Sequence, residues 1–309
     1  MTKPRMLVTG GSGFLGRWVV CLARTDWDVT ATYLNNPVVG PYAHWRSLDV
    51  RNRPAVTSLM EETIPRVVVH TAALNPGQGS AFSAVNEQGT QNVAEAAALI
   101  GARLVHVSTD VVFDGKQGSY VEQDLPAPIT AYGRSKALAE IAVHRSGARA
   151  IIVRTSLIYG PSALPPAPGP KGVSWREWDR QTHWVVGDLR AGRPVRLFTD
   201  ERRCPIWVAS LASALVEVAA LDLAQERGPQ VLHVAGADAV SRYQFGVRLA
   251  LFHGVDPAGI SPVLSETSGL NRPLDCSLDC SRANSILRTP LPGVNEVLSC
   301  AGAPPGAKS

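Results

Sequence analysis

The chain has 309 residues, of which 45% are hydrophobic and 18% charged, with a mean hydropathy of +0.02. This composition is typical of a globular protein and excludes a disordered or fibrous chain, and the length predicts about two domains or one large fold with a smaller lobe. Thirty Lys and Arg against 26 Asp and Glu give a formal charge of +4, without a dense basic run that would predict a nucleic-acid partner.

The cysteines and the start of the chain indicate the compartment. The five cysteines are Cys21, Cys204, Cys276, Cys280 and Cys300. Their number is odd and no C-x-x-C pair occurs, so neither a disulfide framework nor a metal site is predicted. The start of the chain lacks the pattern of a signal peptide, and no stretch is apolar for long enough to span a bilayer. We therefore expect a cytoplasmic protein with reduced thiols and no membrane partner.

Short β-branched runs alternate with segments of helical periodicity over the first half of the chain and again near residue 230. The runs are 5–10, 28–34, 66–73, 103–109, 149–155 and 230–235. They are almost continuously apolar, which is what a strand buried on both faces of a parallel sheet requires. The pattern predicts an α/β fold with a doubly wound parallel sheet.

The alternation of strand and helix patterns ends after Tyr159. Residues 160–172 contain five prolines and predict a long loop, which we expect to lie over a site. Three tryptophans follow it: Trp175, Trp178 and Trp184. They are at least as suited to the core of a lobe as to sugar binding. We expect the sheet domain to comprise 1–159 and 195–237, and a smaller C-terminal substrate-binding lobe to comprise 160–194 and 238–309.

A glycine-rich turn joins the first strand to the first helix. Gly10, Gly13 and Gly16 form the spacing G-x-x-G-x-x-G. The first glycine permits a tight turn, the second permits a pyrophosphate to approach, and the third permits close packing of helix on strand. The spacing alone also fits a plain tight turn. Its place between a strand and a helix favours a Rossmann domain whose helix N-terminus binds a dinucleotide.

The end of the second strand bears on which dinucleotide binds. It reads Tyr33-Leu-Asn-Asn36, where a carboxylate would normally bind the 2′-hydroxyl of an adenine ribose. NADP(H) is therefore preferred, with NAD(H) as the alternative. Arg17 is placed to reach a 2′-phosphate or to be a solvated first-turn residue, and Asp49 with Val50 is placed to flank the adenine or to form a turn. The other expected cofactor contacts are Phe14, Leu15, Asn35, Thr71, Ala72 and Ala73.

Tyr132 and Lys136 are separated by one turn of the helix predicted for residues 131–145. A phenol has a pKa of about 10, and a neighbouring ammonium stabilises its phenolate. Lys136 is also placed to hold a nicotinamide ribose. A surface Tyr-Lys pair is the alternative for an isolated match.

These motifs occur together with Ser108-Thr109-Asp110 at the end of a buried strand, and the sequence thereby resembles an extended short-chain dehydrogenase/reductase of the dTDP-4-dehydrorhamnose reductase branch. The shared segments are 107–115, 153–160, 232–236, 241–243 and 272–279. The resemblance implies that Thr109 hydrogen-bonds the substrate carbonyl with Asp110 beside it, that Tyr132 delivers the proton, and that Lys136 binds the ribose and tunes Tyr132. Asn86 matches a family Asn behind the site, or is a helix-kinking residue with a structural hydrogen bond.

Two arginines and two departures from the family concern the substrate. Arg203 and Arg272 match positions that present guanidinium groups to a substrate diphosphate, although Arg272 could instead pair with Asp275. Val111 stands where the rhamnose enzymes usually have Tyr, and Leu157 where they have Trp. Both changes remove sugar-facing aromatic rings, so the sugar is left open. Three of the seven histidines, His70, His106 and His233, lie in strand runs and are expected to be buried core residues rather than metal ligands.

These residues predict an NAD(P)H-dependent reductase of a nucleotide-linked 4-keto sugar, with hydride from nicotinamide and the proton from Tyr132. Dehydratases of the family have an acidic pair after the catalytic Thr, whereas Val111 follows Asp110 here, so net reduction is favoured. The alternatives are an epimerase or dehydratase, and a regulatory subunit similar to the non-catalytic partner of methionine adenosyltransferase. A homodimer is compatible with the sequence.

Overall fold

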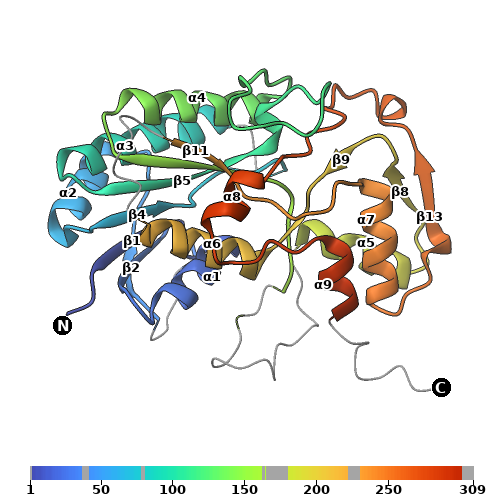
Figure 1. Cartoon of the computed structure of the whole chain (residues 1–309), viewed down its shortest axis with the longest axis horizontal. Helices are drawn as coiled ribbons and strands as arrows, with labels where there is room; N and C mark the ends of the chain where they lie inside the picture. The colour runs from blue at the N-terminus through green and yellow to red at the C-terminus, as the bar shows by residue number, and fades with distance from the viewer. Residues whose placement is uncertain are drawn as a thin grey trace.

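The computed structural model describes residues 2–36, 42–77, 81–161, 164, 180–221 and 230–300. Its centre is a seven-stranded sheet in the order β11-β6-β5-β4-β1-β2-β3, and all neighbouring strands are parallel (Figure 1). The strands are β1 Arg5–Thr9, β2 Asp28–Tyr33, β3 His44–Ser47, β4 Val67–His70, β5 Arg103–Thr109, β6 Ala150–Thr155 and β11 Gln230–His233. The predicted doubly wound parallel sheet is confirmed.

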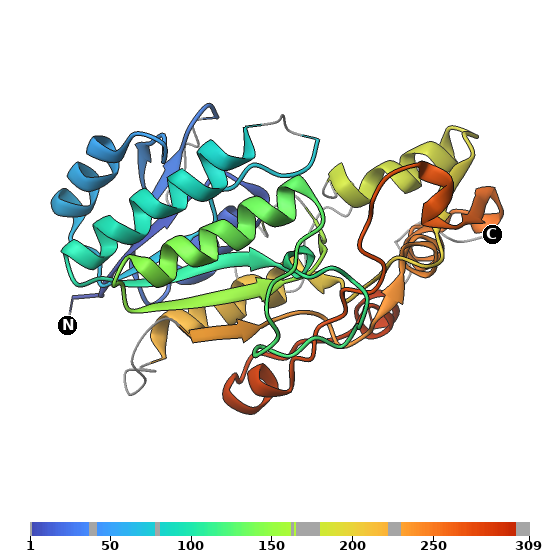
Figure 2. The same ribbon diagram turned by 90° about the horizontal axis from the view of Figure 1, so that it is seen from above.

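Helices cover both faces of this sheet. They are α1 Phe14–Ala23, α2 Arg53–Thr63, η1 Ser83–Gln88, α3 Gly89–Leu99, α4 Ala131–Arg145, α6 Val208–Ala220 and α8 Ser281–Ile286. Consecutive strand residues point to opposite faces. Val69 and Val105 therefore pack in the core with α1 and α6, while Val68 and Leu104 pack in the core with α2, α3 and α4. Figure 2 shows α3 and α4 lying side by side over the sheet.

The smaller lobe lies beyond the carboxyl ends of the strands (Figures 1 and 2). Its main elements are α5 Arg180–Arg190, β8 Val195–Phe198, α7 Arg242–Phe252, β13 Ile260–Val263 and α9 Val294–Cys300. Short strands β7 Ile158–Tyr159 and β10 Ile206–Trp207 pair with each other, as do β9 Arg202–Arg203 and β12 Val240–Ser241. The remaining short helices are η2 Asp110–Val112, η3 Pro257–Gly259 and η4 Ser265–Ser268.

The pairing of the strands differs from the expected domain limits at two places. β8 was expected to open the second sheet-domain segment, but it pairs with β13 and not with the central sheet. Ala283 of α8, expected in the lobe, is buried in the core beneath the sheet. We propose that β8 belongs to the lobe and α8 to the sheet domain, because each buries its apolar side there.

Most of the expected loop over the site, residues 162–163 and 165–172, lies outside the described residues, as do Trp175 and Trp178. Trp184 of α5 is described and is 44% exposed, so it is not a core residue. In the part of the chain that the structure describes, no helix has both the length and the apolar character needed to cross a membrane.

A buried ion pair joins α4 to β6. Arg154 Nη2 lies 2.8 Å from Glu140 Oε2, and Ser108 Oγ donates to Glu140 Oε1 at 2.5 Å. Both charged side chains are only 4% exposed. We expect Glu140→Ala to lower the free energy of unfolding by about 3–5 kcal/mol, because it leaves the Arg154 charge buried without its partner. Urea denaturation measures this change.

The matched control is Glu62→Ala, which breaks the Arg46–Glu62 pair. Both partners of that pair are about half exposed, at 48% and 58%. Its loss is expected to cost about 0–1 kcal/mol, because water screens exposed charges. Equal losses in the two variants would contradict a stabilising role for the buried pair.

Candidate active site

The glycine turn lies at the carboxyl end of β1, between β4 and β2, where the strand order of a doubly wound sheet reverses. Gly10 has φ +71°, and a Cβ there would lie 2.6 Å from the Ala72 Cα. A Cβ on Gly16 would lie 2.2 Å from the Gly10 carbonyl oxygen. Only glycine fits either position. α1 begins directly after Gly13, which has no side chain to cap it, so the first-turn N–H groups can bind an anion.

The neighbouring cofactor candidates lie along the same edge of the sheet. Thr71 Oγ1 donates to the Thr9 carbonyl at 2.8 Å, which ties the end of β4 to the glycine turn. Ala72 packs directly on Gly10. The glycine cradle and this close wall fit the pyrophosphate of a dinucleotide.

The residues expected near the adenosine differ in burial and in their contacts. Asn35 is exposed beyond the end of β2, and Arg17 is half-buried on α1. Asp49 forms a turn, because its Oδ1 accepts from the Arg51 amide at 3.0 Å and its carboxylate pairs with the Arg51 guanidinium at 2.6 Å. The turn-forming alternative for Asp49 is therefore the one that the geometry supports. Val50 is buried against Gly89.

Thr109, Asp110 and Tyr132 come together at the carboxyl end of β5. Thr109 Oγ1 donates to Asp110 Oδ1 at 3.1 Å, and Tyr132 Oη donates to Asn75 Oδ1 at 3.4 Å. Thr130 Oγ1 accepts from the Gly133 amide at 3.0 Å, which starts α4 and places Tyr132 in its first turn. Burial and the nearby Asp110 carboxylate raise the pKa of Tyr132, and a hydrogen bond with Thr109 acts in the opposite direction.

The helix η2 packs against the start of α4 through Val111 and Gly133. A Cβ on Gly133 would lie 2.2 Å from the Val111 carbonyl oxygen, so the two backbones touch. The Val111 amide donates to Thr109 Oγ1 at 3.4 Å, so this half-buried residue lies beside Thr109.

Lys136 lies one turn further along α4 and is only 2% exposed. Its Nζ donates to the Val107 carbonyl at 2.7 Å and lies 3.4 Å from His106 Nε2. Burial lowers the pKa of Lys136 to about 8, against the opposite effect of the Glu140 carboxylate. The ammonium is bound to the Val107 carbonyl of β5, and stabilisation of the Tyr132 phenolate by Lys136 stays a prediction.

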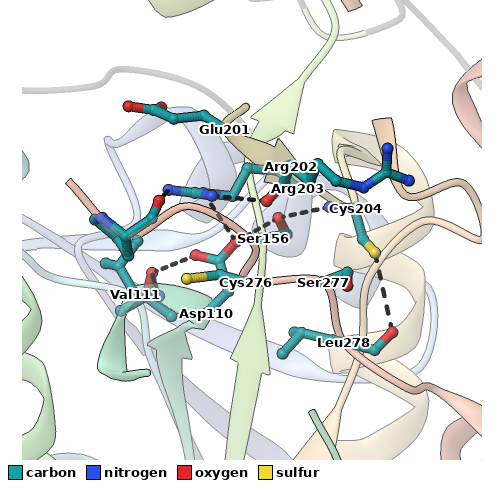
Figure 3. A network of polar contacts seen from close by, with 12 residues as sticks. Asp110, Val111, Ser156, Glu201, Arg202, Arg203, Cys204, Cys276, Ser277 and Leu278 are labelled. Carbon is teal, nitrogen blue, oxygen red and sulfur yellow. Dashed lines mark hydrogen bonds and ion pairs between the residues drawn. The ribbon is translucent and has the colours of Figure 1, made fainter. Parts of the chain in front are cut away.

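Asp110 connects the sheet to the lobe (Figure 3). Ser156 Oγ donates to Asp110 Oδ2 at 2.6 Å, and Arg203 Nε lies 3.8 Å from the same oxygen. Burial raises the pKa of Asp110, while Arg203 and the hydrogen bonds lower it. Arg203 also donates to the carbonyls of Pro273 at 2.8 Å and Leu274 at 2.9 Å. The prediction that Arg203 binds a diphosphate is not supported, because its guanidinium is buried and already bound to the protein.

Asn86 has the structural role that was the alternative to substrate binding. It lies in the π-helical segment η1, where the helix is locally widened. Its Oδ1 accepts from the Leu74 amide at 2.7 Å, and its Nδ2 donates to the Leu74 carbonyl and to Ser135 Oγ, both at 3.0 Å. These bonds fix the segment after β4 against α4, which places Asn75 beside Tyr132.

A cavity of about 230 Å³ lies in the lobe between α5, β8 and α7. Its apolar and aromatic lining includes Leu157, Trp184, Val185, Leu197, Phe198, Phe245 and Leu249, and its cationic lining is Arg196, Arg242 and Arg272. A pocket that combines aromatic surface with several guanidinium groups suits a ligand with a ring and a multiply charged anion.

Glu201 holds two of these arginines. It is 1% exposed, accepts from Arg272, and lies 3.7 Å from Arg242 Nε. The suggested pair between Arg272 and Asp275 does not form, because Asp275 pairs with Arg202 at 3.4 Å. Sequence reasoning missed Arg196, Arg242 and Glu201, although Arg242 lies in a segment shared with the reductase branch.

Comparisons with known proteins agree with this arrangement. Residues 4–301 match the RmlD substrate binding domain family. The dTDP-4-dehydrorhamnose reductase of Mycobacterium tuberculosis is 34% identical over 277 residues, which cover 85% of this chain and 80% of the relative. Methionine adenosyltransferase 2 subunit beta of Mus musculus is 26% identical over 305 residues, which cover 95% of this chain and 87% of the relative.

Solved structures show the same fold. The dTDP-4-dehydrorhamnose reductase of Bacillus anthracis, in complex with NADP, has a TM-score of 0.77 at 25% identity, covering 97% of this chain and 98% of that chain. A hypothetical dTDP-4-dehydrorhamnose reductase from Sulfolobus tokodaii has a TM-score of 0.76 at 29% identity, covering 93% and 96%. With its glycine turn and its Thr109–Tyr132–Lys136 arrangement, this chain belongs to the RmlD substrate binding domain family, whose fold is that of an extended short-chain dehydrogenase/reductase.

Proposed function

We propose that the protein is an NAD(P)H-dependent reductase of a nucleotide-activated 4-keto sugar, of the dTDP-4-dehydrorhamnose reductase type. The observation that carries this proposal is the meeting of Thr109, Asp110 and Tyr132 at the end of β5, with Lys136 on the same helix and the glycine turn at the same sheet edge. The similarity to the Mycobacterium tuberculosis reductase and to the NADP complex from Bacillus anthracis supports it.

The dinucleotide, when bound, supplies the hydride. The first-turn N–H groups of α1 and the glycine cradle hold its pyrophosphate, and Lys136 holds its nicotinamide ribose. Tyr132 donates its proton to the oxygen of the substrate carbonyl as that oxygen becomes negative, and the raised pKa of its phenol keeps it protonated until then. Thr109 would orient the carbonyl by donating its hydroxyl hydrogen to the carbonyl oxygen, which requires that hydroxyl to turn away from Asp110 when the substrate binds.

The lobe cavity is the proposed site of the nucleoside diphosphate. Arg242 and Arg272 supply the guanidinium groups for the diphosphate, in place of the buried Arg203, and Trp184 and Phe198 offer aromatic surface for the base. Leu157 lines this cavity, and the preceding Ser156 bonds Asp110 of the catalytic group. The segment of Ser156 and Leu157 therefore connects the proposed catalytic group to the wall of the lobe cavity.

The alternatives make different predictions in the same assay. A regulatory subunit like that of methionine adenosyltransferase would bind a dinucleotide without consuming it. An epimerase would change the sugar and regenerate its cofactor. A homodimer and a cytoplasmic location stay predictions from the sequence.

The assay that tests the function follows the absorbance of NADPH and NADH with a panel of 4-keto nucleotide sugars. We expect consumption by the wild type and a roughly 10²–10⁴-fold lower turnover for Tyr132→Phe, because the variant lacks the proton donor. The variant should keep its thermal stability and its cofactor affinity. Full activity of Tyr132→Phe would exclude Tyr132 as the proton donor, whereas binding without consumption across the panel would exclude the proposed reduction.

We propose NADP(H) as the preferred cofactor, since no carboxylate lies at Asn35 and Arg17 lies at the start of α1. A charge-assisted hydrogen bond to the 2′-phosphate is worth about 1.5–3 kcal/mol. Arg17→Ala should therefore weaken NADPH on the order of ten- to a hundred-fold while sparing NADH. Asn35→Asp should also disfavour NADPH, by repelling the phosphate. Titration of both cofactors into the three proteins decides this, and equal affinities throughout would refute the preference.

A further inference from the structure

Two buried histidines lie directly beneath the proposed catalytic group. His70 ends β4, and His106 is its partner in the parallel register of β5. Their rings are stacked with centroids 5.4 Å apart, and neither is more than 1% exposed. His70 Nδ1 lies 2.6 Å from Thr9 Oγ1, and its Nε2 lies 3.0 Å from Thr90 Oγ1. Both nitrogens of His70 are therefore engaged, and its ring is a fixed surface for His106.

His106 contacts Lys136 through a nitrogen whose protonation state follows from its partner. Its Nε2 lies 3.4 Å from Lys136 Nζ. An ammonium has three donors and no acceptor, so Nε2 must be the unprotonated nitrogen of a neutral ring. The ring proton is then on Nδ1, which has no hydrogen-bond partner among the described residues. Burial and the neighbouring Lys136 ammonium hold the pKa of His106 well below its usual value, which agrees with a neutral ring.

We propose that His106 is a positioning residue for Lys136, and this inference rests on the proposed reductase function. The neutral ring and the Val107 carbonyl accept two of the three ammonium N–H groups, which leaves one to bind the ribose. His106 thereby fixes the direction of the remaining N–H and favours the charged form of a buried lysine. An aliphatic residue at this position would leave a buried donor unpaired, which is costly.

The charged groups around Lys136 set the expected pH dependence. Glu140 lies on α4 itself and is neutralised by Arg154 of β6, while Tyr132 lies one turn before Lys136 with Asp110 beside it. His70 and His106 face it from β4 and β5. The lysine has a pKa of about 8, so its ammonium is present below that pH and is lost above it. The contribution of the Lys136 ammonium to dinucleotide affinity should therefore be present below about pH 8 and be lost above it.

The test compares His106→Phe, which keeps a stacked ring without an acceptor, with His106→Gln, which restores an acceptor. The dissociation constant of NADPH is measured by fluorescence from pH 6 to 10, without substrate. We expect His106→Phe to weaken NADPH binding about ten-fold at neutral pH, because the variant loses one hydrogen bond to a charged group. The loss of NADPH affinity with rising pH should also begin at a lower pH than in the wild type. His106→Gln should stay close to the wild type in both respects.

The matched control is His233→Phe, which changes a buried histidine at the end of β11 that contacts the Tyr120 carbonyl. It should leave NADPH affinity and its pH dependence unchanged even if the melting temperature falls. An unchanged pH profile in His106→Phe, or a shift of the same size in His233→Phe, would overturn the proposal.

A second measurement does not require His106→Phe to fold. Nitrogen-15 NMR of histidine-labelled wild type, assigned with His106→Gln, should show a neutral His106 protonated on Nδ1 between pH 6 and 7.5. A ring protonated on Nε2 would overturn the contact with Lys136. If the wild type binds neither NADPH nor NADH, the proposed function fails, while the NMR result still decides the contact.

Discussion

The position of the lobe relative to the sheet domain depends on the hydrogen bonds and the ion pair of one buried carboxylate, that of Asp110. A buried carboxylate is tolerated only when it is paired or hydrogen-bonded. Asp110 is 3% exposed, and its partners come from three segments: Thr109 at the end of β5, Ser156 after β6, and Arg203 of β9. Arg203 then reaches the carbonyls at 273 and 274. One carboxylate therefore fixes the position of the lobe segments relative to the catalytic hydroxyls (Figure 3).

Helix α4 has a row of polar side chains on one face. Tyr132, Lys136 and Glu140 are spaced by four residues, so they share one face of the helix. That face meets β5 and β6, where Val107 and His106 bind Lys136, and Arg154 binds Glu140. The helix is therefore anchored to the sheet by polar contacts along the face that carries the proposed chemistry. Such contacts are directional, so they fix the rotation of the helix more tightly than apolar packing does.

The sequence predicted the parts of the fold that are set by local patterns. The strand at 103–109 and the helix at 131–145 occur with the predicted bounds, because a continuous apolar run and a helical period are properties of neighbouring residues. β3 was missed, since His44–Ser47 is a mostly exposed edge strand without an apolar run. β8 was also missed as a strand, because its partner β13 lies more than 60 residues further along the chain.

In the candidate site, too, the residues that form local patterns were predicted and those that depend on distant contacts were not. Gly10, Gly13 and Gly16, and the pair Tyr132 and Lys136, are recognised by their spacing. Of the two arginines expected at a diphosphate, Arg272 lines the cavity, whereas the role of Arg203 is not supported, because spacing does not reveal that a guanidinium is already bound by the protein. Arg203 is bound by carbonyls 70 and 71 residues away, whereas Arg242 lines the cavity with Glu201 behind it. No local pattern marks Glu201 as a buried anchor, since only the packed lobe removes it from water.

The two positions that depart from the rhamnose enzymes bear on how the substrate is selected. Val111 lies beside Thr109, and Leu157 lines the lobe cavity. Neither side chain can form a hydrogen bond, so neither can distinguish sugars by the orientation of a hydroxyl group. A site gains large discrimination from buried polar groups that the wrong ligand leaves unpaired, and only modest discrimination from apolar contacts. In the proposed complex, Val111 and Leu157 therefore select by shape, while Arg242 and Arg272 select for the charge of the diphosphate.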